Sequence, residues 1–532
     1  MNPTVRFGKQ NVTVNRATVT CAEDNHNCQL SLNYSSEHLS AIVEIPELPI
    51  GKYYVVISNC TDIIHLICSL LADDLRSIRS LALCSRLYSS VALPALYSHL
   101  SKFPADYDDE DRLAEDPTAY TDRLTKWSSL WKTLAYSSLS PRTTTINYAA
   151  QLRVLDLRDL CSLMEEFSKH FGQTAREDFF DGGLEAYNKT RVMSVGKRNN
   201  RRFDWQLSAD CLTDLIVKET RNVTTLIRQT TLSDHLHLWL QNTPLLESLQ
   251  VFSGAPLGDD RVAEALVGCP NLRSLELYYW PPQMINGVLE RSDVLLARLL
   301  GSMTGGLKRF VIKNGGECFS ALALSALTVR HGKSLTELEV VDISPLCFYA
   351  LALAPEITNL HCCSIHVDDM AAWADGYMEI AAVSEFFARN TSLERLNVGI
   401  LETNNVLGGA LKSLHLKHLS ITHISDEILP DSFWPSIASQ ASTLETLVLD
   451  HTTQFFELQI PPEEMLRSIC LLHKLKTLTI ATFYSLVRDS EVGRIVESCR
   501  NIEEISFASP ALSDVTLQHL CKLQRLRIFN TR

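Results

Sequence analysis

The phrase Leu-x-x-Leu-x-Leu returns throughout the second half of this chain and restricts its fold more than any other feature. It is clearest at Leu272-Arg-Ser-Leu275-Glu-Leu277, Leu393-Glu-Arg-Leu396-Asn-Val398 and Leu444-Glu-Thr-Leu447-Val-Leu449. With Ile, Val, Phe or Cys allowed at the later apolar positions, further units begin at Leu246, Leu307, Leu335, Ile357, Leu411, Leu475, Ile502 and Leu523. The eleven starts have a mean spacing of about 28 residues, a period typical of stacked repeats.

Side-chain alternation explains this spacing. In a strand, the second and third apolar residues of each unit point to the same face. An amphipathic helix also brings residues i and i+3 together, but the third apolar residue two positions further on favours a strand. Helical patterns at 261–267 and 492–498 precede the cysteine-led turns at Cys269 and Cys499. We therefore predict an α/β leucine-rich-repeat solenoid, with parallel strands on the concave face and helices outside.

The register of the first units predicts which side chains face out of the sheet. The third, fifth and seventh positions are Ser248, Gln250 and Phe252 in one unit, and Ser274, Glu276 and Tyr278 in the next. Phe252 and Tyr278 should lie about 4.8 Å apart across adjacent strands, with Trp280 just beyond. The hypothesis is that a protein substrate contacts Phe252, Glu276, Tyr278 and Trp280. The alternative is that a neighbouring loop such as 281–282 covers the aromatic side chains.

Other predicted concave positions carry charges of both signs. They include Arg309, Lys313, Glu337, Glu339, His361, Arg395, His415, Lys417, Arg525 and Arg527. A ligand rich in phosphate would require one sign of charge, whereas a protein surface matches a mixed one. The mixture therefore favours a protein partner.

Composition excludes some partners and suggests a compartment. The net charge of −13 argues against general binding of nucleic acid or anionic membranes, because both require a basic surface. No run of 18 apolar residues occurs, and the first residues do not resemble a secretory signal. The 15 cysteines are scattered through apolar contexts, as expected of reduced thiols. We expect a soluble chain in the cytoplasm or nucleus.

A compact helical pattern precedes the repeats. Asp62 can cap a helix through Leu71, the acidic pair Asp73-Asp74 opens a second helix, and a third apolar run extends from Leu87 to Leu100. The phrases Leu83-Cys84-Ser85-Arg86 and Leu93-Pro94-Ala95-Leu96-Tyr97 complete the order. This block resembles the F-box, although Ser58-Asn59-Cys60 stands where an F-box usually opens on Leu-Pro.

Together with the repeats, the chain is similar to fungal F-box proteins with leucine-rich repeats, which have an RNI-like solenoid. The resemblance divides the chain into a poorly assigned segment (1–57), an F-box-like block (58–104), an acidic linker with connecting helices (105–150) and the solenoid (151–532). It implies an adaptor whose F-box binds a Skp-type linker protein of a cullin ubiquitin ligase while the solenoid holds a substrate for ubiquitin-dependent degradation. The implied linker contacts are Leu66, Ile67, Leu70, Leu75, Leu93, Pro94 and Leu96. The alternative is a leucine-rich-repeat scaffold or regulatory protein in which these helices only cap the solenoid.

No motif predicts catalysis or a cofactor. The chain has no phosphate-binding loop, no dinucleotide fingerprint, no Gly-x-Ser-x-Gly and no His-Glu-x-x-His. His361-Cys362-Cys363 with His366 has metal-like residue types, but the pattern puts them on one strand and the following turn, with Cys362 in the core. We therefore predict no enzyme activity, no cofactor and no metal.

Overall fold

The computed structural model divides into two compact units, residues 1–226 and 227–532. It describes residues 4–7, 10–13, 17–21, 28–34, 39–44, 53–57, 64–65, 67–68, 75–84, 86–98, 117–139, 147–169, 172–195, 198–228, 235–285, 288–367, 380–399, 403–422, 433–450, 463–481, 487–507 and 512–531.

The N-terminal segment, left nearly unassigned by its sequence pattern, contains antiparallel strands. β1 (Thr4–Phe7) pairs with β2 (Gln10–Thr13). A second sheet has the order β3-β4-β5-β6. Its strands are β3 (Ala17–Cys21), β4 (Cys28–Tyr34), β5 (Leu39–Glu44) and β6 (Tyr53–Ile57).

The F-box-like block folds as helices around a small apolar core of its own. The described helices are α2 (Leu75–Ala82) and α3 (Arg86–Ser98), and α3 contains Pro94. Ile78, Leu81 and Ala82 recur at helical spacing on α2, so one face of this helix is buried. Among the described residues, this core consists of Ile64, Cys68, Ile78, Leu81, Ala82, Val91 and Ala92.

A long helix, α5 (Pro117–Leu139), connects this block to the first repeats. It packs against α6 (Leu157–Ser168), α7 (Gln173–Phe180) and α8 (Trp205–Val217). Two indole N–H groups of α5 donate to one carboxylate of α6 and hold the helices together. The acidic run at 106–111 lies outside the described residues.

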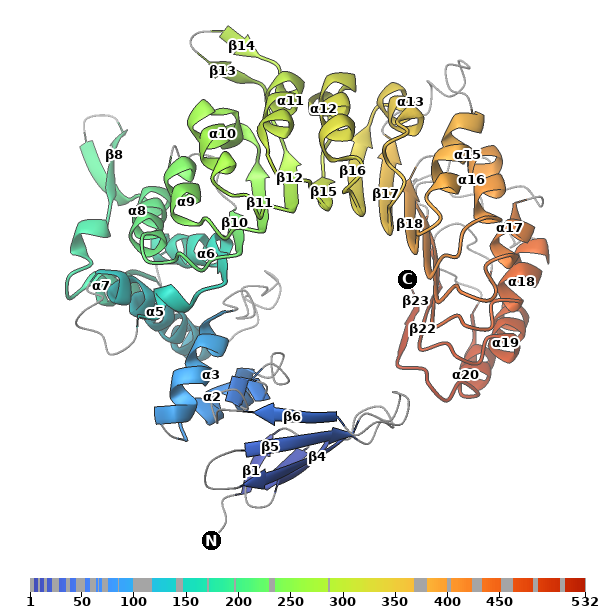
Figure 1. The fold of residues 1–532 in the computed structure, drawn as a ribbon, viewed down its shortest axis with the longest axis horizontal. Helices are drawn as coiled ribbons and strands as arrows, with labels where there is room; N and C mark the ends of the chain where they lie inside the picture. The colour runs from blue at the N-terminus through green and yellow to red at the C-terminus, as the bar shows by residue number, and fades with distance from the viewer. Residues whose placement is uncertain are drawn as a thin grey trace. The chain divides into compact units, whose positions relative to one another are not determined.

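The repeats form a 13-stranded sheet with the order β23-β22-β21-β20-β19-β18-β17-β16-β15-β12-β11-β10-β7, and the predicted α/β solenoid is confirmed. Within residues 227–532 the strands form one layer and line the inner side, while the helices form the outer layer (Figure 1). The strands are β7 (Val154–Asp156), β10 (Thr225–Arg228), β11 (Ser248–Ser253), β12 (Ser274–Tyr279), β15 (Arg309–Ile312), β16 (Glu337–Ile343), β17 (Cys362–Val367), β18 (Arg395–Gly399), β19 (His418–Thr422), β20 (Thr446–Asp450), β21 (Thr477–Ala481), β22 (Glu504–Phe507) and β23 (Ile528–Thr531).

The outer layer of the second unit consists of α-helices of unequal length. They are α9 (Leu236–Asn242), α10 (Asp260–Val267), α11 (Ser292–Ser302), α12 (Ala321–His331), α13 (Pro345–Leu353), α15 (Ile380–Arg389), α16 (Thr403–Leu411), α17 (Trp434–Ala438), α18 (Glu463–Cys470), α19 (Asp489–Ser498) and α20 (Asp514–Leu520). Two antiparallel hairpins, β8 (Thr190–Val195) with β9 (Arg198–Phe203) and β13 (Gln283–Ile285) with β14 (Val288–Glu290), extend from the repeats.

One backbone contact recurs where each strand begins. The Lys308 carbonyl accepts from two successive amides of the next repeat, Thr336 at 2.8 Å and Glu337 at 2.9 Å. The Thr336 carbonyl in turn accepts from His361 and Cys362. The same step continues to Arg527 and Ile528, which both donate to Glu503. Because every repeat repeats this pairing, it fixes the register of neighbouring strands.

A second contact recurs at several helix ends and joins them to the preceding repeat. The side chain of His331 accepts from the Leu307 amide, that of Asn390 accepts from the Leu360 amide, and that of Gln440 accepts from the Leu416 amide. Cys269 and Cys499 occupy similar turns, and their thiols donate to carbonyls of the preceding repeat. The cysteine-led turns are therefore part of the packing between repeats.

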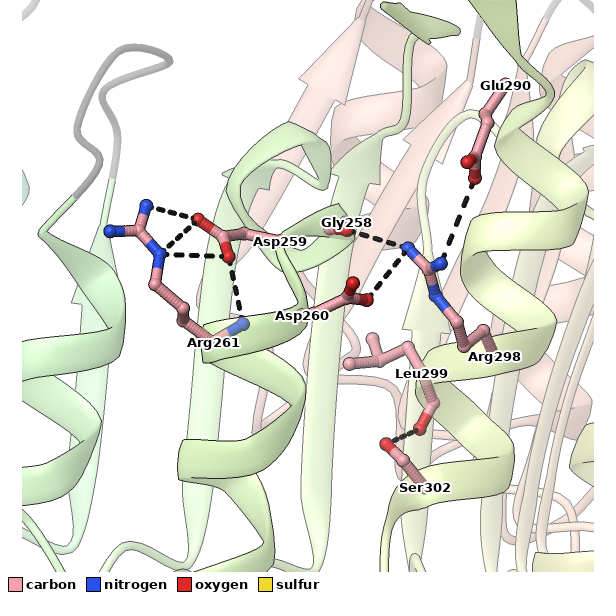
Figure 2. Close-up of polar contacts among 8 residues, drawn as sticks. All are labelled: Gly258, Asp259, Asp260, Arg261, Glu290, Arg298, Leu299 and Ser302. Atoms are coloured by element: carbon pink, nitrogen blue, oxygen red, sulfur yellow. Dashed lines mark hydrogen bonds and ion pairs between the residues drawn. The ribbon is translucent and has the colours of Figure 1, made fainter. Parts of the chain in front are cut away.

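Polar contacts also join α10 and α11 in the outer layer (Figure 2). The Asp259 side chain caps α10 by accepting from the Arg261 amide at 2.9 Å. Arg298 on α11 donates to the Gly258 carbonyl at 2.8 Å and forms ion pairs with Asp260 and Glu290. On the same helix, the Ser302 hydroxyl donates to the Leu299 carbonyl.

Three of the predicted repeat starts are wrong. The strands place the first leucine of these units at Leu360, Leu416 and Leu526 instead of Ile357, Leu411 and Leu523. In each case the predicted start is buried before the strand begins, Ile357 and Leu523 in turns and Leu411 at the end of α16. An apolar residue at this place imitates the first leucine of a unit. Cys363 is consequently the core residue, and Cys362 faces out of the sheet beside Glu337.

Candidate functional site

The aromatic pair predicted for the concave face is present. Val251 pairs with Leu277 and Ser253 with Tyr279 across parallel strands, so Phe252 lies beside Tyr278. The ring centroids of Phe252 and Tyr278 are 5.3 Å apart, and Tyr279 contacts Phe252 edge-on at 5.4 Å. The Phe252 side chain is 40% exposed. These rings present an apolar surface at one place on the sheet.

Trp280 does not belong to that exposed surface, and its predicted position is corrected. It is only 4% exposed. Its indole packs so closely over Gly254 that a Cβ on this glycine would lie 2.3 Å from the ring. The chain leaves β12 at Tyr279, so Trp280 no longer follows the strand's alternation and turns toward Gly254. It therefore supports the loop after β11.

Glu276 is present beside the aromatic pair but is already bonded on both sides. Its carboxylate accepts from the Gln250 amide at 3.0 Å and from Arg309 at 2.7 Å. Arg309 also forms an ion pair with Glu337 at 3.3 Å. Glu276 therefore orders the neighbouring polar side chains, and a partner would meet Gln250 and Arg309 together with it.

Those of the implied linker contacts that the structure describes lie in the helical block. Ile67, Leu93 and Leu96 are partly buried and pack against its apolar core. Pro94 lies inside α3 and is partly buried, and Leu75 is the first residue of α2, although its side chain lies outside the described residues. Leu66 and Leu70 also lie outside the described residues.

The same helical block also exposes Leu83. It lies in the turn between α2 and α3 and is 79% exposed, more than any other large apolar side chain in the described part of the chain. Cys84 beside it is also exposed. The sequence pattern marked the Leu-Cys-Ser-Arg phrase but did not predict the exposure of its leucine.

The described residues contain no cluster of three or more His, Cys, Asp or Glu side chains able to hold a metal ion. Burial raises the pKa of the Cys269 thiol to about 11 and that of Cys499 to about 12. These thiols therefore stay protonated near neutral pH. Among the described helices, none combines the length and apolar character needed to cross a membrane.

Comparison with known proteins finds likenesses in structure alone. No family model and no curated protein matches the sequence. The Rad7 and Elc1 complex of yeast matches with 14% identity and a TM-score of 0.37, covering 80% of this chain and 98% of that chain. The leucine-rich-repeat protein LIC12759 of Leptospira interrogans matches with 14% identity and a TM-score of 0.25, covering 59% and 85%. At such low values, neither likeness says what this chain binds.

Proposed function

We propose that this protein is the substrate-recognition adaptor of a cullin ubiquitin ligase. Its helical block at 58–104 binds a Skp-type linker protein, and the face of its repeat sheet holds a protein substrate. The adaptor itself performs no chemistry and requires no cofactor. It acts in the cytoplasm or nucleus, where the ligase and its substrates meet.

The observation that supports this proposal most strongly is the helical block with its own core. α2 and α3 bury Ile78 and Val91 against each other, while Leu83 stays exposed at their turn. A small helical pair that exposes a leucine in this way is suited to dock on another protein. The F-box resemblance falls on these same helices.

The alternative, in which these helices only cap the repeats, has less support within residues 1–226. There α5 packs against α6, α7 and α8. A solenoid end requires one cover, and α5 already supplies helical packing to those repeats. Because α3 also contacts the turn at Ala149–Gln151 before the first repeat strand, the proposal rests on the α2–α3 turn, where Leu83 is exposed.

Co-purification tests the proposal. The full chain is mixed with a purified Skp-type linker. A double variant that carries Leu93→Glu and Leu96→Glu is tested in parallel. We expect a stable complex with the unaltered chain and none with the variant, because two charges would enter a partly buried apolar surface. Circular dichroism checks that the repeats of the variant remain folded. Absence of a complex with the unaltered chain would leave the scaffold alternative.

A further inference from the structure

The sheet face contains a pocket over β17. Small side chains of Cys362 and Ser364 form its floor, between longer side chains of the neighbouring strands. Its volume is about 260 Å³. This is below the roughly 300–1,000 Å³ usual for sites that enclose a small-molecule ligand, and it fits a single protein side chain. The residues around it are Arg309, Val311, Glu337, Leu338, Glu339, Cys362, Cys363, Ser364, Arg395, Asn397 and His418.

On the β16 side, the pocket has two carboxylates, and the cation that Glu337 contacts is shared with Glu276. Glu337 forms an ion pair with Arg309 at 3.3 Å. Glu339 forms an ion pair with Lys313 at 2.6 Å. Arg309 lies on β15 and Lys313 directly follows it, and β15 is the strand on the far side of β16. Because Arg309 lies closer to Glu276, at 2.7 Å, Glu337 keeps part of its negative charge.

On the β18 side, the pocket has a cation that no described residue neutralises. Arg395 lies opposite Cys362 in the register and is exposed, and within the described part of the chain it forms no ion pair. His418 lies beside Arg395 on β19. Burial, and then the charge of Arg395, lower the pKa of His418, so this ring is neutral near pH 7. Arg395 is thus the cation of the pocket that forms no ion pair with a described residue.

Two polar atoms in the pocket also lack hydrogen bonds. Ser364 Oγ and Asn397 Oδ1 are buried and have no partner among the described residues. Leaving such atoms unbonded destabilises the folded chain. Ser364 and Asn397 lie opposite each other on adjacent strands. A ligand that supplies an acceptor for the hydroxyl and a donor for the amide oxygen would satisfy both.

We propose that the β17 pocket binds the carboxylate of an Asp or Glu side chain in a protein segment lying across the sheet. Arg395 donates two N–H groups to this carboxylate, the Ser364 hydroxyl donates a third hydrogen bond, and Asn397 Oδ1 accepts from a backbone N–H of the segment. A phosphate dianion suits the pocket less well, because Glu337 and Glu339 would repel its second charge. This inference rests on the proposed function and specifies the class of substrate.

A peptide selection tests the proposal. A phage-displayed library of random 12-residue peptides is selected on the immobilised full chain, and affinities of the enriched peptides are measured by fluorescence polarisation. We expect one fixed Asp or Glu in the enriched peptides. Replacing that residue with Ala, or Arg395→Gln in the protein, should weaken binding by about tenfold or more. Selection on Arg395→Glu should instead enrich Lys or Arg at the same peptide position.

The matched control is Arg467→Gln. Arg467 is an exposed arginine of α18 that pairs with Glu464 on its own helix, and its loss should leave peptide affinity unchanged. Failure to enrich any peptide, enrichment without a fixed acid, or full affinity in Arg395→Gln would overturn the proposal. If a phosphoserine peptide binds tenfold more tightly than its Asp or Glu form, the pocket prefers phosphate and the carboxylate proposal is overturned. Arg395→Gln should still bind the Skp-type linker, so failure of the pocket remains distinct from failure of the adaptor function.

Discussion

The indole N–H of Trp131 donates to Oδ2 of Asp159 at 2.5 Å, deep between α5 and α6. The Trp127 indole donates to the same oxygen at 2.8 Å. Despite these hydrogen bonds, burial raises the pKa of Asp159 to about 6. A single carboxylate therefore joins the connecting helix to the first repeat and titrates just below neutral pH.

Asp159→Asn should reduce the dependence of stability on pH. With a folded pKa of about 6 and an unfolded pKa near 3.9, the folded state holds more protons between these values. The free energy of unfolding should fall by up to about 3 kcal/mol as the pH rises from about 4 to about 6, and remain low above it. The free energy of unfolding of the Asn variant should change less with pH, and at pH 7 it should be higher than that of the unaltered chain. Urea unfolding at several pH values measures this, with the exposed Asp260→Asn as control. Equal pH profiles in both proteins would show that Asp159 is not the titrating group.

The buried side chain of His331 should make stability depend on pH in the direction opposite to that of Asp159. Its Nδ1 accepts from the Leu307 amide and its Nε2 donates to the Leu300 carbonyl at 3.0 Å. Burial lowers the pKa of His331, so stability should be lost as the pH falls below about 6.5. His331→Asn should remove this loss, since Asn390, two repeats later, accepts from the equivalent amide of Leu360 and donates to the Ile357 carbonyl of the preceding repeat. His331→Ala should lose about 2–4 kcal/mol at pH 7.5. Urea unfolding at pH 7.5 and 5.5 tests both variants. If the unaltered chain and His331→Asn lose the same free energy of unfolding between these pH values, the prediction is wrong.

Gly254→Ala should destabilise the second unit by about 1–3 kcal/mol, because the new Cβ would meet the indole of Trp280. Gly301→Ala is the matched control. It lies inside α11 with open space around its Cβ position, and should stabilise by about 0.5–1 kcal/mol. Thermal unfolding of both variants measures the difference. A neutral Gly254→Ala would mean that Trp280 can move away without loss of packing.

The cysteines described here should differ strongly in reactivity. Cys84 and Cys521 are exposed, whereas Cys269 and Cys499 are buried with raised pKa values. Iodoacetamide at pH 7.5 should label the first two within minutes and the last two only after urea is added. Mass spectrometry of tryptic peptides measures this order. Equal labelling of Cys499 in the native protein would indicate that its turn opens readily.

Sequence patterns predicted the solenoid well because the Leu-x-x-Leu-x-Leu phrase reports burial directly. Leu275 and Leu277 are both fully buried, and the aromatic pair follows from the same register. The pattern failed at Ile357, where an apolar residue in a turn mimics the first leucine. It also could not place Trp280, because alternation ends where a strand ends. The β17 pocket was missed because the shifted register assigned Cys362 to the core and put His415 in place of His418.

The proposed function requires the helical block to bind a Skp-type linker, and a calorimetric titration measures this binding. Leu83 on the α2–α3 turn and Val329 on α12 are 79% and 78% exposed. The linker is titrated calorimetrically into the full chain and into Leu83→Glu and Val329→Glu. We expect the linker to bind both the unaltered chain and Val329→Glu. Its affinity for Leu83→Glu should be at least tenfold weaker, which is about 1.4 kcal/mol of binding free energy. No binding by the unaltered chain, or equal affinity in all three, would contradict it.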